Sequence, residues 1–348
     1  MIQRSAAGIE RWIRPLGAGL SVDTGHPESR FVLDALRASD KVVVTHGHAD
    51  HARAGHHHVI ATPETLAIME ARYGSGFAQK RTALAYHEPM EMGDCTIRLV
   101  PAGHVLGSAQ VVIDHAGRRV VVSGDYKRKA DPTCAPFEPV PCDVFVTEAT
   151  FALPVFSHPD PMGEIEKLLH SLDVFPGRCH VVGAYSLGKA QRLIALLRQA
   201  GYNKTIYLHG AQQKLAALYE DLGVPLGELA PATAGEKGRP RDDLAGEIVI
   251  APPSALADRW SRRLPDPLII MASGWMQIRQ RAKQSGVEMP LILSDHADWA
   301  DLLRTIEEVA PLEVWVTHGR ESALIRALGL KGVRARALSL VGYEDDAE

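Results

Sequence analysis

Six of the sixteen histidines in this 348-residue chain fall between residues 46 and 58. The densest part is the heptapeptide THGHADH, residues 45 to 51, which directly follows the apolar run KVVV at 41–44. KVVV has the pattern of a short buried strand. The four polar side chains of the HxHxDH motif are too closely spaced to share one face of a helix or strand. On a loop at the end of that strand, however, they can converge on a small volume.

Neutral imidazoles and a carboxylate are ligands that suit zinc, and also manganese and iron. We expect His46 and His48 to bind one metal ion, and Asp50 and His51 to bind a second. The HHH run at 56–58 has no acid beside it and is expected in a solvated loop rather than at a metal.

Three more candidate ligands each follow a predicted strand. His104 comes after the strand predicted at 96–100, Asp125 after the one at 119–123, and His318 after the one at 314–317. The two oxygens of a carboxylate such as Asp125 can bridge two cations about 3.5–4 Å apart. The sequence therefore predicts a two-metal site where several strands end at one edge of a sheet sandwich.

The pattern of elements changes along the chain. Short β-type runs fill the first 150 residues, including a predicted hairpin at 110–123 and one helix that begins at Pro63 with Thr62 as its N-cap. From Pro161 helical and strand patterns alternate, which is typical of a parallel sheet. Residues 165–290 carry 16 Lys and Arg against 12 Asp and Glu, whereas the whole chain has a net charge of −4. A basic middle segment fits either a nucleic-acid-facing surface or ordinary solvated surface.

Composition and termini limit the cellular setting. The chain has no run of 18 apolar residues and no apolar segment near Met1 of the kind that a secretory signal requires. Four widely spaced cysteines without a CxxC motif indicate reduced thiols. We therefore expect a cytoplasmic protein with no membrane partner.

The order of these residues resembles the metallo-β-lactamase superfamily: an acid after an early strand (Asp23 in SVDTG), the HxHxDH run, a histidine, an aspartate and a late histidine. The resemblance implies an α/β fold, an αββα sandwich with two metals at one sheet edge. It assigns three histidines to one metal (His46, His48 and His104), and one aspartate and two histidines to the other (Asp50, His51 and His318). Asp125 would bridge the two, and Asp23 would brace the metal loop by hydrogen bonds.

Two further residues narrow the resemblance to the β-CASP nucleases, which carry a domain inserted into the lactamase fold. Glu148 in TEATF and His296 in LSDHADW match the extra acid and histidine of that branch. The implied metallo-β-lactamase domain comprises residues 1–160 and 291–348, and the inserted β-CASP domain 161–290. LSDHADW, AGHVLGSAQ and ATPETLAIMEARYG are most similar to the bacterial DNA-ligase-associated exonucleases.

The resemblance implies a DNA exonuclease of DNA repair that uses two Zn²⁺ or Mn²⁺ ions and acts beside an ATP-dependent DNA ligase. Two metals lower the pKa of a bridging water and neutralise charge on the phosphoryl group. His296 is the candidate proton donor to the leaving group, and Asp50 also belongs to the catalytic set. Glu148 would hydrogen-bond the other nitrogen of His296, fixing its tautomer and raising its pKa.

Candidate substrate contacts lie at three places. Ser186 and Lys189 precede a helix whose exposed N–H groups suit a phosphate, with a cap facing the core as the alternative. Lys127 and Arg279 belong to two basic clusters, for which solvated surface is the alternative.

Other functions stay open. An RNA-processing nuclease of the ribonuclease J or cleavage/polyadenylation type would use the same catalytic residues. A thioesterase or lactamase-like hydrolase would not need the insert or the Glu148 and His296 pair. A catalytically silent nucleic-acid-binding scaffold would normally lack some of the ligands found here.

Overall fold

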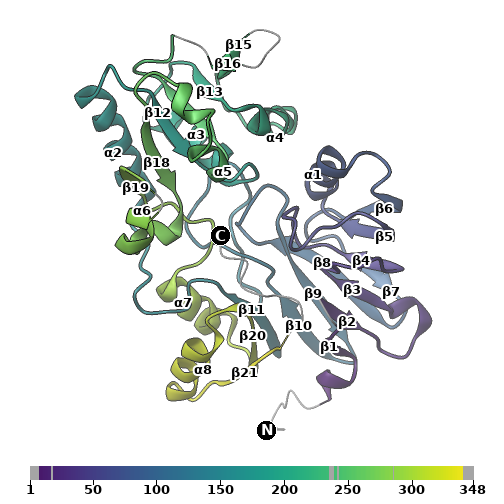
Figure 1. Cartoon of the computed structure of the whole chain (residues 1–348). Helices are drawn as coiled ribbons and strands as arrows, with labels where there is room; N and C mark the ends of the chain where they lie inside the picture. Colours follow the sequence, from purple (N-terminus) through teal and green to yellow (C-terminus); the bar gives the residue numbers. More distant parts are fainter. Residues whose placement is uncertain (1–7, 17–18, 235–238, 241–242, 285, 340–348) are drawn as a thin grey trace. The chain divides into compact units, whose positions relative to one another are not determined.

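The computed structural model describes residues 8–16, 19–234, 239–240, 243–284 and 286–339 of the chain (Figure 1). The chain divides into two compact units. The first unit is Met1–Ser157 with His296–Glu348, and the second unit is His158–Asp295.

The first sheet of the first unit has the strand order β1-β2-β3-β4-β5-β6. Its strands are β1 (Ile13–Pro15), β2 (Leu20–Val22), β3 (Phe31–Leu33), β4 (Lys41–Val43), β5 (His56–Ala61) and β6 (Ala78–Ala83). β2 pairs antiparallel with β1 and β3, whereas β3, β4, β5 and β6 run parallel to one another. The carboxyl ends of β3 and β4 therefore meet at one edge of the sheet, and β2 ends at the opposite edge.

The second sheet has the order β21-β20-β11-β10-β9-β8-β7. Its strands are β7 (Met90–Met92), β8 (Cys95–Pro101), β9 (Ala109–His115), β10 (Arg118–Val122), β11 (Val144–Ala149), β20 (Glu313–Gly319) and β21 (Arg334–Ala337). The predicted hairpin is β9–β10; Ala116 (φ 49°) and Gly117 (φ 71°) are both left-handed, as a two-residue hairpin turn requires.

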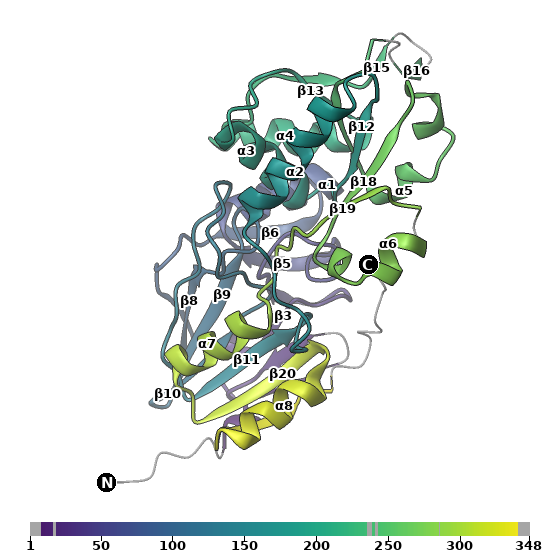
Figure 2. The ribbon, with the colours of Figure 1, turned by 90° about the vertical axis from the view of Figure 1, so that its left-hand side faces the viewer.

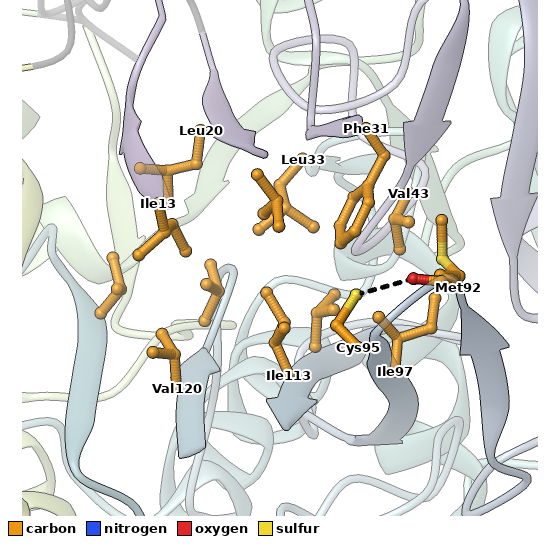
Figure 3. Close-up of a cluster of buried hydrophobic side chains, with 14 of the residues drawn as sticks. Ile13, Leu20, Phe31, Leu33, Val43, Met92, Cys95, Ile97, Ile113 and Val120 are labelled. Atoms are coloured by element: carbon orange, nitrogen blue, oxygen red, sulfur yellow. Dashed lines mark hydrogen bonds between the residues drawn. The ribbon is translucent and has the colours of Figure 1, made fainter. Parts of the chain in front are cut away.

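The two sheets face each other across an apolar core (Figure 3). Alternate residues of each strand point into this core, and Figure 3 shows side chains of the first sheet opposite those of the second, including Leu33, Phe31 and Val43 against Ile97 and Ile113. Each of these five side chains is at most 3% exposed. The period-two alternation of apolar residues therefore determines which face of each strand is buried.

Helices cover the outer faces of the sheets. α1 (Pro63–Tyr73) packs on the first sheet through Met69, which shares a core with Val42 and Val59. α7 (Trp299–Val309) and α8 (Glu321–Leu330) pack on the second sheet, beside β11 and β20 (Figure 2). Helix, two sheets and helices make the four layers of the αββα sandwich that the resemblance implied.

The second unit is built on a parallel sheet with the order β14-β13-β17-β12-β18-β19. Its strands are β12 (His180–Gly183), β13 (Ile206–Leu208), β14 (Leu229–Pro231), β17 (Ile248–Ala251), β18 (Leu268–Ala272) and β19 (Met289–Leu291). Its helices are α2 (Pro161–Val174), α3 (Lys189–Gln199), α4 (Gly210–Asp221), α5 (Pro253–Leu256) and α6 (Arg279–Gln284), and β15 (Thr233–Ala234) pairs with β16 (Arg239–Pro240). The parallel sheet expected from the α/β alternation is confirmed.

One local prediction is wrong: the HHH run at 56–58 is not a solvated loop but the beginning of β5. His56 is buried, and His58 Nε2 lies 2.8 Å from Thr82 Oγ1 on the neighbouring β6. Pairing with β6 therefore extends the strand three residues before the predicted beginning at Val59.

All four cysteines are free thiols, as predicted. Among the described residues, no helix combines the length and the apolar character needed to cross a bilayer.

Candidate metal centre

The HxHxDH loop follows β4 and packs its first histidine into the protein. His46 is fully buried, and its ring centroid lies 4.9 Å from that of His48, 4.1 Å from that of His51 and 4.7 Å from that of His104. His104 belongs to the loop between β8 and β9, so histidines from both sheets meet at this edge.

The Asp125 carboxylate lies close to three of these four histidines. Its Oδ2 is 3.5 Å from His46 Nε2, 3.5 Å from His51 Nε2 and 3.7 Å from His104 Nε2. The loop after β10 reaches this place because Gly124 (φ 56°) passes close to Thr45, where a Cβ would lie 2.8 Å from the Thr45 Cβ. The sequence SGD thus combines a glycine that allows the close approach with the carboxylate that uses it.

The distances between the side-chain atoms fit a bound cation. Four ligand atoms about 2.0–2.1 Å from a tetrahedral zinc ion lie roughly 3.3–3.4 Å from one another. His48 Nδ1 and His104 Nε2 are 3.0 Å apart, and the contacts of Asp125 with His46 and His104 are 3.5 and 3.7 Å. The ligand atoms of these four residues all lie within 4.8 Å of one another.

The protonation states favour a metal as well. Burial lowers the pKa of His46 far below its ordinary value, so the ring is neutral, which is the form that binds metals. His46 Nε2 is buried and has no hydrogen-bond partner among the described residues. A buried imidazole nitrogen without a partner carries a desolvation cost that a coordinated cation would remove.

The surroundings of His51 and Asp125 attract positive charge. Burial raises the pKa of Asp125 to about 7, so its ionised form needs a nearby cation. Burial alone lowers the pKa of His51, but Asp125, Asp50 and Asp34 outweigh this effect and raise it to about 10. A proton or a metal ion on His51 Nε2 would balance the charge of Asp125 and Asp50, whose Oδ2 atoms lie 3.5 and 3.9 Å from that nitrogen.

Asp34, not Asp23, braces the metal loop, so this prediction from the sequence is wrong. The Asp34 carboxylate accepts hydrogen bonds from Thr45 N (2.8 Å) and Thr45 Oγ1 (2.7 Å), and its Oδ2 lies 2.8 Å from His51 Nδ1. Asp23 instead accepts a hydrogen bond from Gly25 N and pairs with Arg30. Asp34 follows β3, which runs parallel to β4, whereas Asp23 follows the antiparallel β2.

The loop that carries His104 is closed by Ser108. Ser108 Oγ accepts hydrogen bonds from His104 N (3.0 Å) and Val105 N (3.2 Å), and Ala102 N donates to Ser108 O (3.1 Å). This tight loop explains why the sequence reads AGHVLGS, with a small hydroxyl residue four positions after the histidine.

Glu148 and His296 form a buried pair. His296 Nδ1 lies 2.9 Å from Glu148 Oε2, and Glu148 Oε1 accepts a hydrogen bond of 2.7 Å from the backbone N–H of Tyr126, next to Asp125. Burial raises the pKa of Glu148, but His296 and the Tyr126 N–H outweigh this effect, so the pKa lies below its ordinary value. One potential ligand atom from each of Asp125, Glu148 and His296 also lies within 4.8 Å of the other two.

Of the two remaining predicted ligands, the structure describes the side chain of Asp50 but not that of His318. Asp50 lies at the rim with its side chain 64% exposed, and its Oδ2 is 3.9 Å from His51 Nε2. His318 belongs to β20, but its side chain lies outside the described residues.

The predicted substrate contacts are corrected in two places. Lys127 is 2% exposed and its Nζ lies 2.5 Å from Asp131 Oδ2, so it does not face a nucleic acid. Lys189 is also buried, with Nζ 3.5 Å from Asp295 Oδ2. Burial and pairing inside the fold, which basic residue types do not reveal, account for both errors.

The N–H groups expected at the beginning of α3 have partners within the chain. Gly188 N donates to Gln191 Oε1 (2.9 Å), Lys189 N to Leu187 O (3.1 Å) and Ala190 N to Tyr185 O (3.0 Å), while the Gln191 side chain donates to Ser186 O (3.0 Å). The α3 N-terminus is thus a capped helix end rather than an open phosphate site. Arg279, at the start of α6, is exposed.

The chain is similar in sequence to several known proteins. Residues 18–178 match the family model described as a β-lactamase superfamily domain. A probable DNA ligase of Opitutus terrae is 29% identical over 90% of this chain. The endoribonuclease YSH1 of Candida albicans is 25% identical over 67%, and the cleavage and polyadenylation specificity factor subunit 3-I of Arabidopsis thaliana is 23% identical over 71%. The chain spans 30%, 33% and 42% of the length of these three relatives.

Among solved structures, a protein of unknown function from Enterococcus faecalis V583 is similar with a TM-score of 0.58 and 13% identity, over 95% of this chain and 98% of that one. This likeness concerns the fold, and it agrees with the sandwich described above. The resemblance found in the sequence is confirmed to this extent: residues 18–178 carry a β-lactamase superfamily domain.

Proposed function

We propose that this chain is a metal-dependent exonuclease that hydrolyses DNA phosphodiester bonds during DNA repair. The observation that carries the proposal is the position of Asp125, whose Oδ2 lies within 3.5–3.7 Å of nitrogens of three histidines, next to the Glu148–His296 pair. A carboxylate among imidazoles is a donor set for divalent metals, and a separate histidine–carboxylate pair supports proton transfer.

Two divalent ions, Zn²⁺ or Mn²⁺, would supply a hydroxide at neutral pH and neutralise charge on the phosphoryl oxygens. In this proposal His46, His48 and His104 would hold one ion, His51, Asp50 and His318 would hold the other, and Asp125 would be shared between the two. The neutral state of His46 and the carboxylates around His51 support this assignment.

The chain's own residues then carry the proton. Glu148 holds the Nδ1 side of the His296 ring, which fixes the tautomer and directs Nε2 toward the substrate. A proton on Nε2 would pass to the leaving oxygen as the phosphodiester bond breaks. The buried position of Glu148 supports a fixed rather than a fluctuating pair.

The second unit is proposed to be the inserted β-CASP domain. The excess of Lys and Arg over Asp and Glu in its residues 165–290, 16 against 12, supports contact with a nucleic-acid backbone. Exposed Arg279 is one candidate contact. The 29% identity over 90% of the chain with a protein named a probable DNA ligase supports DNA as the substrate and an ATP-dependent ligase as a partner. A cytoplasmic location is part of this proposal.

RNA is the second candidate substrate, because two relatives that match 67% and 71% of this chain are named as an endoribonuclease and a cleavage and polyadenylation factor. Digestion of 5′- and 3′-labelled DNA and RNA strands with Zn²⁺, Mn²⁺ or Mg²⁺ supplied in turn separates the two. We expect stepwise shortening of DNA and its loss in Asp125→Asn. Faster digestion of RNA would replace the proposal with the RNA alternative, and equal activity of Asp125→Asn would refute the catalytic site.

A further inference from the structure

Helix α1 touches the loops that carry the candidate metal ligands at both of its ends. The loop with His46 and His48 belongs to the first sheet, and the loop with His104 belongs to the second. α1 follows β5 and lies beside β5 and β6 in Figure 1. None of the residues considered below is among the proposed ligands.

The first turn of α1 holds the His104 loop. Thr62 Oγ1 donates a hydrogen bond of 2.7 Å to Gly107 O, and Thr65 Oγ1 donates one of 3.0 Å to the same carbonyl. Thr62 Oγ1 also accepts the N–H of Thr65, as an N-cap does. Both threonines are buried, so water does not compete for these hydrogen bonds.

The last turn of α1 holds the HxHxDH loop on both sides. Arg72 Nη1 donates a hydrogen bond of 2.5 Å to Gly47 O, the carbonyl between His46 and His48. Tyr73 Oη donates one of 2.7 Å to Ala52 O, just after the loop. The helix thus contacts the backbone on either side of residues 48–51 of this loop.

The helix itself is fixed against the first sheet. Met69 is fully buried in a core with Val42 and Val59, and the partly buried Leu66 and Tyr73 pack against the same core. A helix that cannot slide transmits the position of one loop to the other, because regular helix geometry sets the distance between its ends.

We propose that α1 is a positioning element of the metal centre: it joins the His104 loop to the HxHxDH loop and thereby fixes the separation of the histidines from the two sheets. The inference rests on the metal centre of the proposed function. Thr65, Arg72 and Tyr73 are positioning residues in this account, since they act through the backbone of the ligand loops.

The test is the affinity of the full chain for Mn²⁺ and, separately, Zn²⁺, measured by calorimetry after chelator treatment, together with the melting temperature of the metal-free protein. Thr65→Val and Tyr73→Phe each remove one hydroxyl and keep the side-chain shape. We expect each to weaken metal binding about tenfold, in the range found for residues that orient ligands. Because α1 acts by joining the two loops, breaking either link already separates them, so the double variant is expected to lose less affinity than the product of the single losses.

Two matched variants make the result specific. Thr65→Ser keeps the hydroxyl and is expected to restore affinity. Arg81→Ala removes the ion pair of Arg81 with Glu70 (2.8 Å), which holds the same helix to β6 without touching either ligand loop. Its metal affinity is expected to stay within about twofold of the wild type.

Wild-type metal affinity in both Thr65→Val and Tyr73→Phe would overturn the inference, and so would an equal loss in Arg81→Ala, since helix stability alone would then explain the effect. The outcome is separable from the proposed function. A chain that loses affinity in these variants but digests no nucleic acid supports the positioning role and refutes the nuclease. Unchanged affinity in a chain that digests DNA refutes the positioning role alone.

Discussion

The substitution Asp34→Asn tests how the metal loop is held. The Asp34 carboxylate makes three contacts of 2.7–2.8 Å, with Thr45 N, Thr45 Oγ1 and His51 Nδ1, and the residue is 7% exposed. Asparagine keeps the size of the side chain but removes the charge. It also presents an NH₂ group to atoms that now donate to a carboxylate oxygen.

The expected cost follows from these contacts. A hydrogen bond to a charged group contributes about 1.5–3 kcal/mol and one between neutral groups about 0.5–1.5 kcal/mol, so the loss is roughly 1 kcal/mol for each bond. Three bonds give a loss of about 3 kcal/mol in the free energy of unfolding, which agrees with the 3–5 kcal/mol typical of breaking a buried ion pair. Because His51 loses its orientation, metal affinity should also fall about 10- to 100-fold.

Urea denaturation of the metal-free chain and calorimetric titration with Mn²⁺ measure the two effects. Asp23→Asn is the matched control. Asp23 is also an acid that follows a strand of the same sheet, but its side chain contacts Gly25 and Arg30 and not the HxHxDH loop. We expect its metal affinity to equal that of the wild type. The reasoning would be refuted if Asp34→Asn bound metal normally or if Asp23→Asn weakened binding instead.

Three further outcomes follow from the structure. Glu148→Gln should lower the single-turnover rate about 10²–10⁴-fold, because His296 loses its charged partner, and should leave metal affinity within about threefold; a comparable loss of metal binding would contradict the assigned role. Lys127→Ala should destabilise the chain by about 3 kcal/mol in urea, because it removes the cation that lies beside the buried Asp131 carboxylate, while KM for the proposed DNA substrate stays the same; a raised KM without destabilisation would indicate a substrate contact. In chelator, the free energy of unfolding should fall as the pH rises from 6.5 toward 10. The pKa of His51 is raised to about 10, so the folded chain holds a proton that the unfolded chain releases above pH 6.5. Denaturation curves that do not change over this interval would contradict the raised pKa of His51.

Local sequence patterns predicted the elements that depend on local signals. The Thr62 cap and Pro63 define the beginning of α1, and the Ala116–Gly117 turn defines the hairpin. Parallel strands end at the same edge of a sheet, which is why residues that follow strands could be grouped in advance. His104 and Asp125 lie 21 positions apart in sequence, yet their side chains are 3.7 Å apart.

The relative direction of neighbouring strands could not be predicted from the sequence. Asp23 and Asp34 both follow short apolar strands, so local pattern does not distinguish them. The difference is that β2 runs antiparallel to β3 whereas β3 runs parallel to β4, which places Asp34, and not Asp23, at the edge that carries the HxHxDH loop. This pairing depends on contacts between strands and is invisible in a single segment.

Side-chain burial was the second limit. Lys127 stands in the basic run KRK, which is typical of a solvated surface, but it packs inside the fold against Asp131. Lys189 is paired with Asp295, 106 positions later in the chain. The partner of a buried cation is set by tertiary packing, so residue type alone favoured the wrong environment.

The most direct test of the account is the number of divalent ions bound per chain, measured by elemental analysis after loading with Zn²⁺ or Mn²⁺ and removal of free metal. The account predicts two ions per wild-type chain and a clear loss in Asp125→Ala, with both proteins folded by circular dichroism. A wild-type chain that binds no divalent ion, or an Asp125→Ala chain that keeps both, would contradict it.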